Sequence, residues 1–230
     1  MAAALDRLRG KFIVFDGPDG SGKGTQIERL AAVLAAAGIP VTRGKDPGGT
    51  PIGDRIRHVL LDFDLSKMNV RCETLLFMAS RAQLVAEVID PALARGDTVL
   101  CDRFVSATCA YQGAAGFDPQ AVIRLAEFAI GDRWPDLTLI VDVPPEVGFA
   151  RTGRSPGGRR GARDVGQRMM FADAHTDAME ARPLEFHQRV RQAFAALPAV
   201  YPRPVMTVDG QGSVDDVHAR VLEAIDRALG

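Results

Sequence analysis

The stretch GPDGSGKGT, residues 17–25, constrains the fold of this chain more than any other. It follows the apolar run FIVF and precedes a helical pattern that begins near Lys23. Its spacing fits the phosphate-loop pattern G-x-x-x-x-G-K-[ST], except that Gly24 stands at the hydroxyl position and Thr25 supplies a hydroxyl one residue later. A glycine-rich turn that happens to carry a lysine is the competing interpretation, and the strand-to-helix setting disfavours it. The sequence therefore predicts a phosphate-binding loop between a strand and a helix.

Bulk composition limits the classes of protein that remain. With 230 residues, 47% of them hydrophobic and 25% charged, the chain can bury one substantial core, and we expect a single domain over residues 1–230. A net charge of −1 argues against a general nucleic-acid or membrane-surface binder, because both need a basic excess. The three cysteines lack metal-ligand spacing, no apolar run reaches the roughly 18 residues of a membrane span, and the head of residues 1–10 is too charged for a secretory signal. We expect a cytoplasmic protein without nucleic-acid or membrane partners.

Apolar runs typical of strands alternate with helical patterns along the chain. Such alternation predicts βαβ units, and hence an α/β fold with a parallel sheet and ligands at the carboxyl ends of its strands. The segment KDPGGT, residues 45–50, holds one proline and two glycines and is expected to form a shaped loop. Strands are predicted at 11–16, 39–43, 98–101, 137–143 and 205–208, and helices at 26–37, 52–61, 71–94, 119–130 and 214–229, with a further helical region at 168–196 that is broken at Pro183.

One segment interrupts this alternation. RTGRSPGGRRGARD, residues 151–164, is rich in arginine and glycine and has no apolar period, so it cannot pack a core. Two interpretations stay open: a solvated insertion, or a lid whose guanidinium groups close over phosphates.

Several motifs together resemble those of thymidylate kinases. They are the phosphate loop, KDPGGT, LLFMASRAQL at 75–84, DRFVSATCAYQG at 102–113 and PDLTLIVDVPPEVGFAR at 135–151, followed by the weaker FHQRVR at 186–191 and VDG at 208–210. The resemblance covers nearly the whole chain except the head and the interval from 151 to about 177. It implies a P-loop NTPase-type three-layer fold, in which helices flank a five-stranded parallel sheet, with a mobile lid at about 151–177. It also implies transfer of a phosphoryl group from ATP to dTMP, giving dTDP and ADP for dTTP biosynthesis, by a homodimer that uses Mg²⁺.

On the donor side, the resemblance assigns the phosphate loop to ATP. Lys23 and the loop amides would hold the phosphates, as glycine-rich turns at helix N-termini do. Thr25 would replace the hydroxyl missing at Gly24 and is a candidate Mg²⁺ ligand. Asp102 would orient a Mg²⁺-bound water, and simple capping of the following turn is the competing interpretation. The candidate ATP-binding residues are Gly17, Asp19, Gly20, Ser21, Gly22, Lys23, Gly24 and Thr25.

On the acceptor side, the resemblance assigns phosphate contacts to Arg57 and Arg103 and base contacts to Phe77 and Arg81. The latter two lie four residues apart, so a helix presents both on one face. There the ring can stack on a base and the guanidinium can donate to thymine O4. Purely structural interpretations also stay open, because most Phe residues in such an apolar run belong to a core and most single helical arginines are only solvated.

The remaining acceptor contacts surround the base edge and the sugar. By resemblance, Thr108 and Gln112 lie at the N3 edge of the base, and Tyr111 fills the space that a ribose 2′-OH would need. Asp19 would reach the 3′-OH, and Asp46 stands where many family members carry Glu. The expected acceptor is therefore a deoxyribonucleotide. The candidate dTMP-binding residues are Asp19, Asp46, Pro47, Arg57, Phe77, Arg81, Arg103, Thr108, Tyr111 and Gln112.

Phosphoryl transfer to an anionic acceptor needs positioned charge rather than a general base. Lys23 and Arg103 are the candidate catalytic residues outside the lid. Because the phosphate loop contains Asp19 and no arginine, the resemblance implies a catalytic arginine from the lid, and Arg154 is chosen among Arg151, Arg154, Arg159, Arg160 and Arg163. The flank DAME, residues 177–180, has Ala178 where the family carries arginine, and it keeps Glu180 for the acceptor site.

Two other functions remain open beside a thymidylate kinase. One is a kinase for another nucleoside monophosphate, in which the loss of Arg81 would hardly change activity. The other is a non-catalytic nucleotide-binding P-loop protein, which has no need for a stacking Phe77, a sugar-crowding Tyr111 and an acceptor arginine together.

Overall fold

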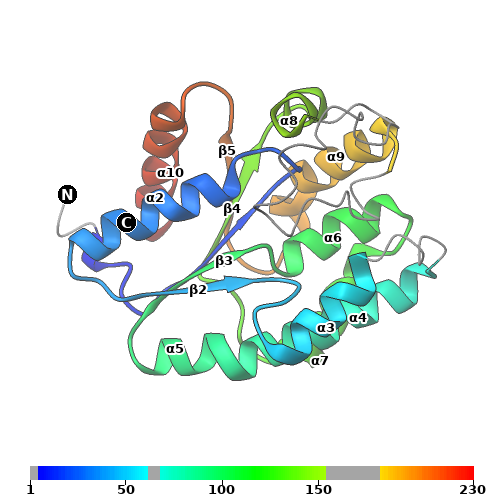
Figure 1. Ribbon diagram of the computed structural model, residues 1–230, viewed down its shortest axis with the longest axis horizontal. Coiled ribbons are helices and arrows are strands. Elements are labelled where there is room, and N and C mark those ends of the chain that lie inside the picture. Colours follow the sequence, from blue (N-terminus) through cyan, green and yellow to red (C-terminus); the bar gives the residue numbers. More distant parts are fainter. Residues whose placement is uncertain (1–4, 62–67, 154–181) are drawn as a thin grey trace, which may run out of the picture.

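The protein is built around a parallel sheet of five strands in the order β2-β3-β1-β4-β5. The computed structural model describes residues 5–61, 68–153 and 182–230. Figure 1 shows the strands side by side with helices on both faces, so the predicted three-layer α/β fold is confirmed. The strands are β1 (Phe12–Asp16), β2 (Val41–Lys45), β3 (Thr98–Asp102), β4 (Leu137–Asp142) and β5 (Val205–Asp209).

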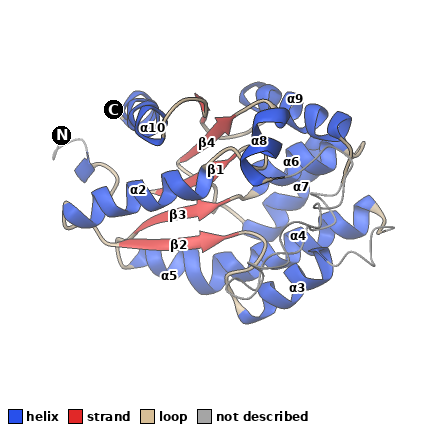
Figure 2. Ribbon diagram, turned by 45° about the horizontal axis from the view of Figure 1, so that its top comes forward, coloured by secondary structure: helices blue, strands red, loops and turns tan. Residues whose placement is uncertain are grey.

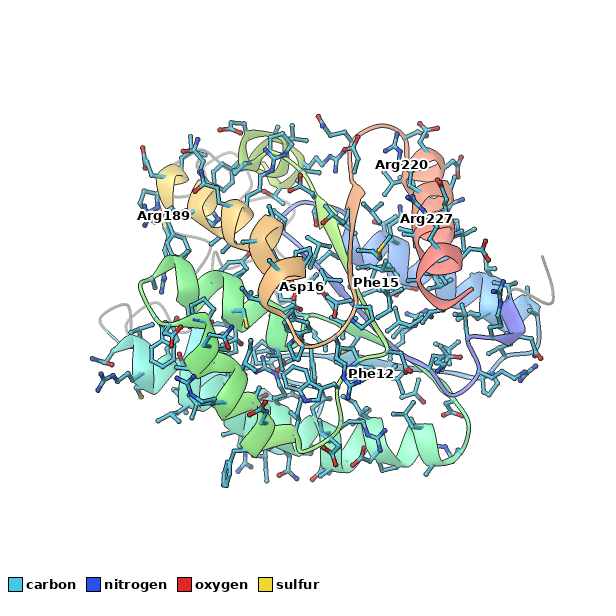
Figure 3. The ribbon with its side chains drawn as sticks, turned by 180° about the vertical axis from the view of Figure 1, so that it is seen from behind. Phe12, Phe15, Asp16, Arg189, Arg220 and Arg227 are labelled. Atoms are coloured by element: carbon cyan, nitrogen blue, oxygen red, sulfur yellow. The ribbon has the colours of Figure 1, made fainter. Side chains whose placement is uncertain are left out.

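Hydrophobic residues on both faces explain why the central strands are buried. Every residue of β1 is buried, as expected for a parallel sheet that helices cover on both sides. Successive β1 residues serve different layers, since Phe12 and Val14 belong to one core cluster and Ile13 and Phe15 to the other. Figure 3 shows these two rings and the adjoining Asp16 near the centre of the molecule.

Two helical layers sandwich the sheet. Figures 1 and 2 show α2 and α10 together on one face, where their apolar residues form one core cluster, and α5, α6 and α9 on the other. The helical segments are α2 (Lys23–Ala36), α3 (Pro51–Leu61), α4 (Val70–Leu84), the π-helical turn η2 (Val85–Ile89), α5 (Asp90–Ala94), α6 (Val105–Ala114), α7 (Pro119–Ile130), α8 (Pro145–Thr152), α9 (Leu184–Val200) and α10 (Val214–Leu229).

The sheet register decides which loops meet. Lys45 pairs with Asp102, and Asp102 with Phe15, so the carboxyl ends of β2, β3 and β1 lie next to one another. The residues that follow these ends are Asp46, Arg103 and the phosphate loop. Three motifs that are far apart in the sequence therefore converge at one edge of the sheet.

Some predicted boundaries were wrong. The second strand was expected at 39–43, but it runs from Val41 to Lys45, because its partner β3 begins only at Thr98. Helices α6 and α8 were not predicted; both are short and overlap the motifs at 102–113 and 135–151. The predicted helix at 71–94 is divided among α4, η2 and α5.

The greater part of the predicted lid, residues 154–177, and the first part of the helical region predicted at 168–196 lie outside the described residues. Within the ranges that the structure covers, no helix is long and apolar enough to cross a membrane.

Candidate active site

The phosphate loop joins β1 to α2, and two of its glycines are required because the backbone of other segments lies too close for a side chain. Gly17 has φ 134°, and a Cβ there would lie 2.2 Å from the carbonyl oxygen of Val141. At Gly20, with φ 72°, a Cβ would lie 2.3 Å from the carbonyl oxygen of Gly148 in α8. Any side chain at either position would collide with backbone. The loop is therefore held between β4 and α8.

Lys23 begins α2 and points back into the loop. Its ammonium group donates to the carbonyl oxygens of Gly17, at 3.1 Å, and Pro18, at 3.0 Å. Burial lowers the pKa of Lys23 from its ordinary value, and the positive charge of Arg103 adds to this effect. Such a site favours a ligand that brings negative charge to the ammonium group.

Asp16 ends β1 and is completely buried. Its carboxylate accepts hydrogen bonds from the Gly17 amide at 2.9 Å, the Ser106 hydroxyl at 2.7 Å and Arg103 Nη1 at 3.2 Å. Burial raises the pKa of Asp16, and Arg103 opposes that shift. Neither Asp16 nor Ser106 was predicted as a site residue, although a charged residue that ends an apolar strand directly before a phosphate loop is a usable signal.

Arg103 follows β3 with φ 66°, a left-handed conformation that is unusual for a residue with a side chain. This turn aims its guanidinium group at the loop, where Nη1 also donates to the Gly17 carbonyl oxygen at 3.2 Å. Nη2 donates to the Asp19 carboxylate and, at 3.2 Å, to the Tyr111 hydroxyl. The guanidinium carbon also lies 4.9 Å from the centre of the Tyr111 ring. Arg103 thus contacts residues predicted for both substrates.

Arg81 and Asp46 form a second arginine–carboxylate pair, and both side chains are only 1% exposed. Arg81 Nε donates to Asp46 at 2.7 Å, and Nη2 donates to the carbonyl oxygen of Phe104 at 3.0 Å and to Thr108 Oγ1 at 2.9 Å. Burial raises the pKa of Asp46, and the charge of Arg81 opposes this. Much of the hydrogen-bonding capacity of Arg81 is therefore used within the protein, which was not predicted from the sequence.

These two arginine clusters border one pocket, which lies beside the phosphate loop. Helix α4 contributes Phe77, and α3 contributes Arg57, whose Nη1 donates to the carbonyl oxygen of Pro47 at 3.0 Å. The pocket also contains Lys45, Leu61 and Ala107, which were not among the predicted site residues, although Lys45 begins the KDPGGT segment. The predicted acceptor residues that line it are Asp19, Asp46, Pro47, Arg57, Phe77, Arg81, Arg103, Thr108, Tyr111 and Gln112.

A predicted Mg²⁺ site can be tested against the donor atoms present. Asp102, the last residue of β3, also lines the pocket, and its buried Oδ1 has no hydrogen-bond partner among the described residues. Such an oxygen fits a metal-bound water as its partner. Thr25 lies exposed on the first turn of α2. The described ranges contain no cluster of three or more acidic, His or Cys side chains that would bind a metal without further ligands.

Among the candidate lid arginines, the structure describes Arg151, in the last turn of α8. Its Nη2 donates to the carbonyl oxygen of Gly210 at 3.0 Å, and its Nη1 lies 3.4 Å from the carbonyl oxygen of Ser21. It therefore links the phosphate loop to the segment after β5. The other predicted lid and flank residues lie outside the described part of the chain: Arg154, Arg159, Arg160, Arg163, Ala178 and Glu180.

The family model for thymidylate kinase matches residues 15–221. The chain belongs to the thymidylate kinase family. It is 41% identical over 221 residues to a thymidylate kinase of Geobacter sp. (strain M21), and 42% identical over 221 residues to one of Citrifermentans bemidjiense. Both matches cover 96% of this chain and 93% of the relative. A third relative, the thymidylate kinase of Halalkalibacterium halodurans, is 35% identical over 222 residues, which cover 96% of this chain and 98% of the relative. The resemblance stated from the motifs is confirmed.

Proposed function

We propose that this protein transfers the γ-phosphoryl group of ATP to dTMP, giving dTDP and ADP. One observation carries the proposal beyond family membership: Asp19 and Arg103 belong both to the surroundings of the phosphate loop and to the lining of the adjoining pocket. An acceptor in that pocket therefore lies next to a donor held by the loop. This adjacency is what transfer between two bound nucleotides requires.

The pocket walls suit a deoxyribonucleotide. The half-buried ring of Phe77 offers a stacking face, and Thr108 and Gln112 present polar groups to the base edge. The hydroxyl of Tyr111 accepts a hydrogen bond from Arg103 Nη2 at 3.2 Å. In the proposed complex, Tyr111 lies on the sugar side of the acceptor and excludes a ribose 2′-OH. Asp19 receives the 3′-OH. Arg57 and Arg103 bind the acceptor phosphate.

Transfer itself depends on positive charge around the moving phosphoryl group. Lys23 holds the outer phosphates of ATP, and Arg103 bridges the acceptor phosphate and the transferred group, stabilising charge that spreads over the equatorial oxygens. No general base is needed, because the acceptor oxygen is already anionic. Mg²⁺, held through water by Asp102 and directly by Thr25, would neutralise phosphate charge. Arg154 is the proposed lid arginine, in a lid over about 151–177 of a single domain spanning 1–230.

We also propose a homodimer that acts in the cytoplasm without nucleic-acid or membrane partners. Large apolar side chains are exposed on neighbouring helices: Ile52 and Val59 on α3, Leu75 on α4 and Phe128, which is 93% exposed, on α7. Burying such a face in a two-fold contact would remove it from water. Analytical ultracentrifugation should show a dimer that Phe128→Glu converts to monomer. A monomeric wild-type protein would contradict this part of the proposal.

The function is tested by a coupled ADP-release assay with dTMP, dUMP, dCMP, UMP, AMP and GMP as acceptors. The proposal predicts that dTMP has the highest kcat/KM, and that Lys23→Met removes activity with every acceptor. Preference for another monophosphate would contradict dTMP as the substrate. ATP binding without turnover on any acceptor would contradict the kinase function altogether.

A further inference from the structure

Glu73 is a buried carboxylate behind the wall of the acceptor pocket. It lies on α4 four residues before Phe77, so the two share one face of the helix. Only 6% of Glu73 is exposed, and its Oε1 accepts a hydrogen bond from Arg182 Nη2 at 3.2 Å. Burial raises the pKa of Glu73, whereas Arg182 and a hydrogen-bonding contact with Gln112 lower it. A buried charge in this position calls for an explanation beyond helix packing.

Gln112 connects this carboxylate to the pocket. It lies on α6, lines the pocket and is only 1% exposed. Neither Oε1 nor Nε2 makes a hydrogen bond of ordinary geometry with the described residues. A buried amide oxygen without a partner is costly, so Oε1 points to a ligand that completes its hydrogen bonds, whereas Nε2 has Glu73 as its polar neighbour.

The two ends of an amide group bind opposite kinds of hydrogen-bonding group on a base, because the oxygen accepts and the nitrogen donates. Thymine and uracil carry a hydrogen on N3, which needs an acceptor, whereas N3 of cytosine is itself an acceptor and needs a donor. Gln112 offers either Oε1 or Nε2, depending on which way its amide is turned. An ionised carboxylate can only accept a hydrogen bond. Glu73 can therefore accept a hydrogen bond from Nε2 of Gln112 but cannot bind its Oε1.

We propose that Glu73 is a positioning residue for base selection, which holds Gln112 Nε2 so that Oε1 accepts the N3–H of the bound pyrimidine. The inference rests on the proposed function, because it places the base of the acceptor beside Gln112. Glu73 thereby favours thymine and uracil over cytosine. It does not distinguish thymine from uracil, since both carry the same N3–H.

The direct test is Glu73→Gln, assayed with dTMP, dUMP and dCMP. A neutral amide at position 73 accepts as well as donates, so the orientation of Gln112 is no longer fixed. We expect kcat/KM for dTMP to fall about tenfold, the value of roughly one hydrogen bond. The value for dUMP should fall in parallel, and the ratio of dTMP to dCMP should fall with them. The matched control is Glu87→Gln, the same chemical change on the exposed turn η2. This control should leave kcat/KM for dTMP and the ratio of dTMP to dCMP unchanged.

A swap variant separates positioning from a general structural role. In Glu73→Gln combined with Gln112→Glu, the amide at position 73 donates to one oxygen of the carboxylate at position 112, and the other oxygen accepts from N3–H. We expect the swap to recover most of the dTMP to dCMP ratio, which mere packing damage would not allow. An unchanged ratio in folded Glu73→Gln, checked by circular dichroism, would overturn the inference. A wild-type protein that ignores dTMP would instead overturn the proposed function.

Discussion

Two arginine–carboxylate pairs border the same pocket, and they differ in how freely they can change partners. Arg81 and Asp46 are both 1% exposed, and the arginine is also bonded to Phe104 and Thr108. The side chain of Arg103 is 21% exposed and shares its donors among Asp16, Asp19 and Tyr111. The first pair is closed within the protein, whereas the second faces the space between the phosphate loop and the pocket.

The difference separates two tasks that the sequence motifs do not distinguish. A fully buried ion pair fixes the shape of a wall, because breaking it leaves an uncompensated charge. A partly exposed arginine that shares its donors among several partners can exchange one of them for a phosphate oxygen. We therefore assign Arg81 chiefly to the architecture of the pocket and Arg103 to the transfer reaction.

The largest expected effect comes from breaking the closed pair. Asp46→Asn leaves Arg81 buried without its counter-charge and should lower the free energy of unfolding by about 3–5 kcal/mol. Urea unfolding followed by circular dichroism measures this change. The control is Glu223→Gln in the exposed pair with Arg227, which should cost less than about 0.5 kcal/mol. Equal effects of the two variants would show that the buried pair is not structural.

A second variant tests Arg103, the more exposed of the two arginines. Arg103→Lys keeps the charge but loses the forked donor geometry, so kcat should fall about 100- to 1,000-fold. The free energy of unfolding should change far less than in Asp46→Asn. Steady-state kinetics at saturating ATP and dTMP measures the loss, with Arg124→Lys on the exposed side of α7 as the control. A kcat within a few-fold of wild type would remove Arg103 from the transfer reaction.

A smaller effect is expected at the residue that anchors Arg103. Asp16→Asn keeps an acceptor oxygen for the Gly17 amide and places an NH2 group opposite the Ser106 hydroxyl, which can accept from it, but it loses the charge that holds Arg103 Nη1. We expect kcat to fall about tenfold with little change in KM for ATP, since a displaced catalytic group loses roughly one hydrogen bond in the transition state. Ser106→Ala removes a neutral contact to the same carboxylate and should have a weaker effect. A loss confined to KM for ATP would contradict the positioning role.

The smallest effect concerns pH. Because burial lowers the pKa of Lys23 below 10.5, its ammonium charge in the free protein is lost at a lower pH than that of an ordinary lysine. ATP phosphates favour the charged form, so ATP affinity should fall as pH rises through this lowered pKa, with uptake of a proton on binding. Calorimetry in buffers of different ionisation enthalpy measures that uptake, and Lys23→Met should abolish it. Binding without proton uptake up to pH 10.5 would contradict the prediction.

The sequence predicted the fold well where a local pattern determines it. Apolar runs bounded by turn residues marked the strands, and the phosphate loop, KDPGGT and DRF were placed at strand ends. Helix α6 was missed because its buried polar residues, such as Ser106 and Gln112, hide the helical period. A function-bearing helix therefore carries a weaker amphipathic signal than a helix that only packs.

The partners of the site residues could not be predicted in the same way. Phe77 and Arg81 were expected to share a helix face, and the i,i+4 spacing sufficed for that. The pairing of Arg81 with Asp46 joins α4 to the end of β2, and the contacts of Asp16 join β1 to α6, so both depend on tertiary register rather than on local sequence. Carboxylates at the ends of neighbouring parallel strands are the one signal that would have indicated them.

The most direct test is a crystal structure with dTMP and an unreactive ATP analogue bound together. We predict that Arg103 Nη2 leaves Asp19 for an acceptor phosphate oxygen while Nη1 remains on Asp16, and that Arg81 keeps its bonds to Asp46, Phe104 and Thr108. A complex in which Arg103 stays on Asp19, or in which Arg81 leaves Asp46 to bind phosphate, would contradict the division between the two arginines.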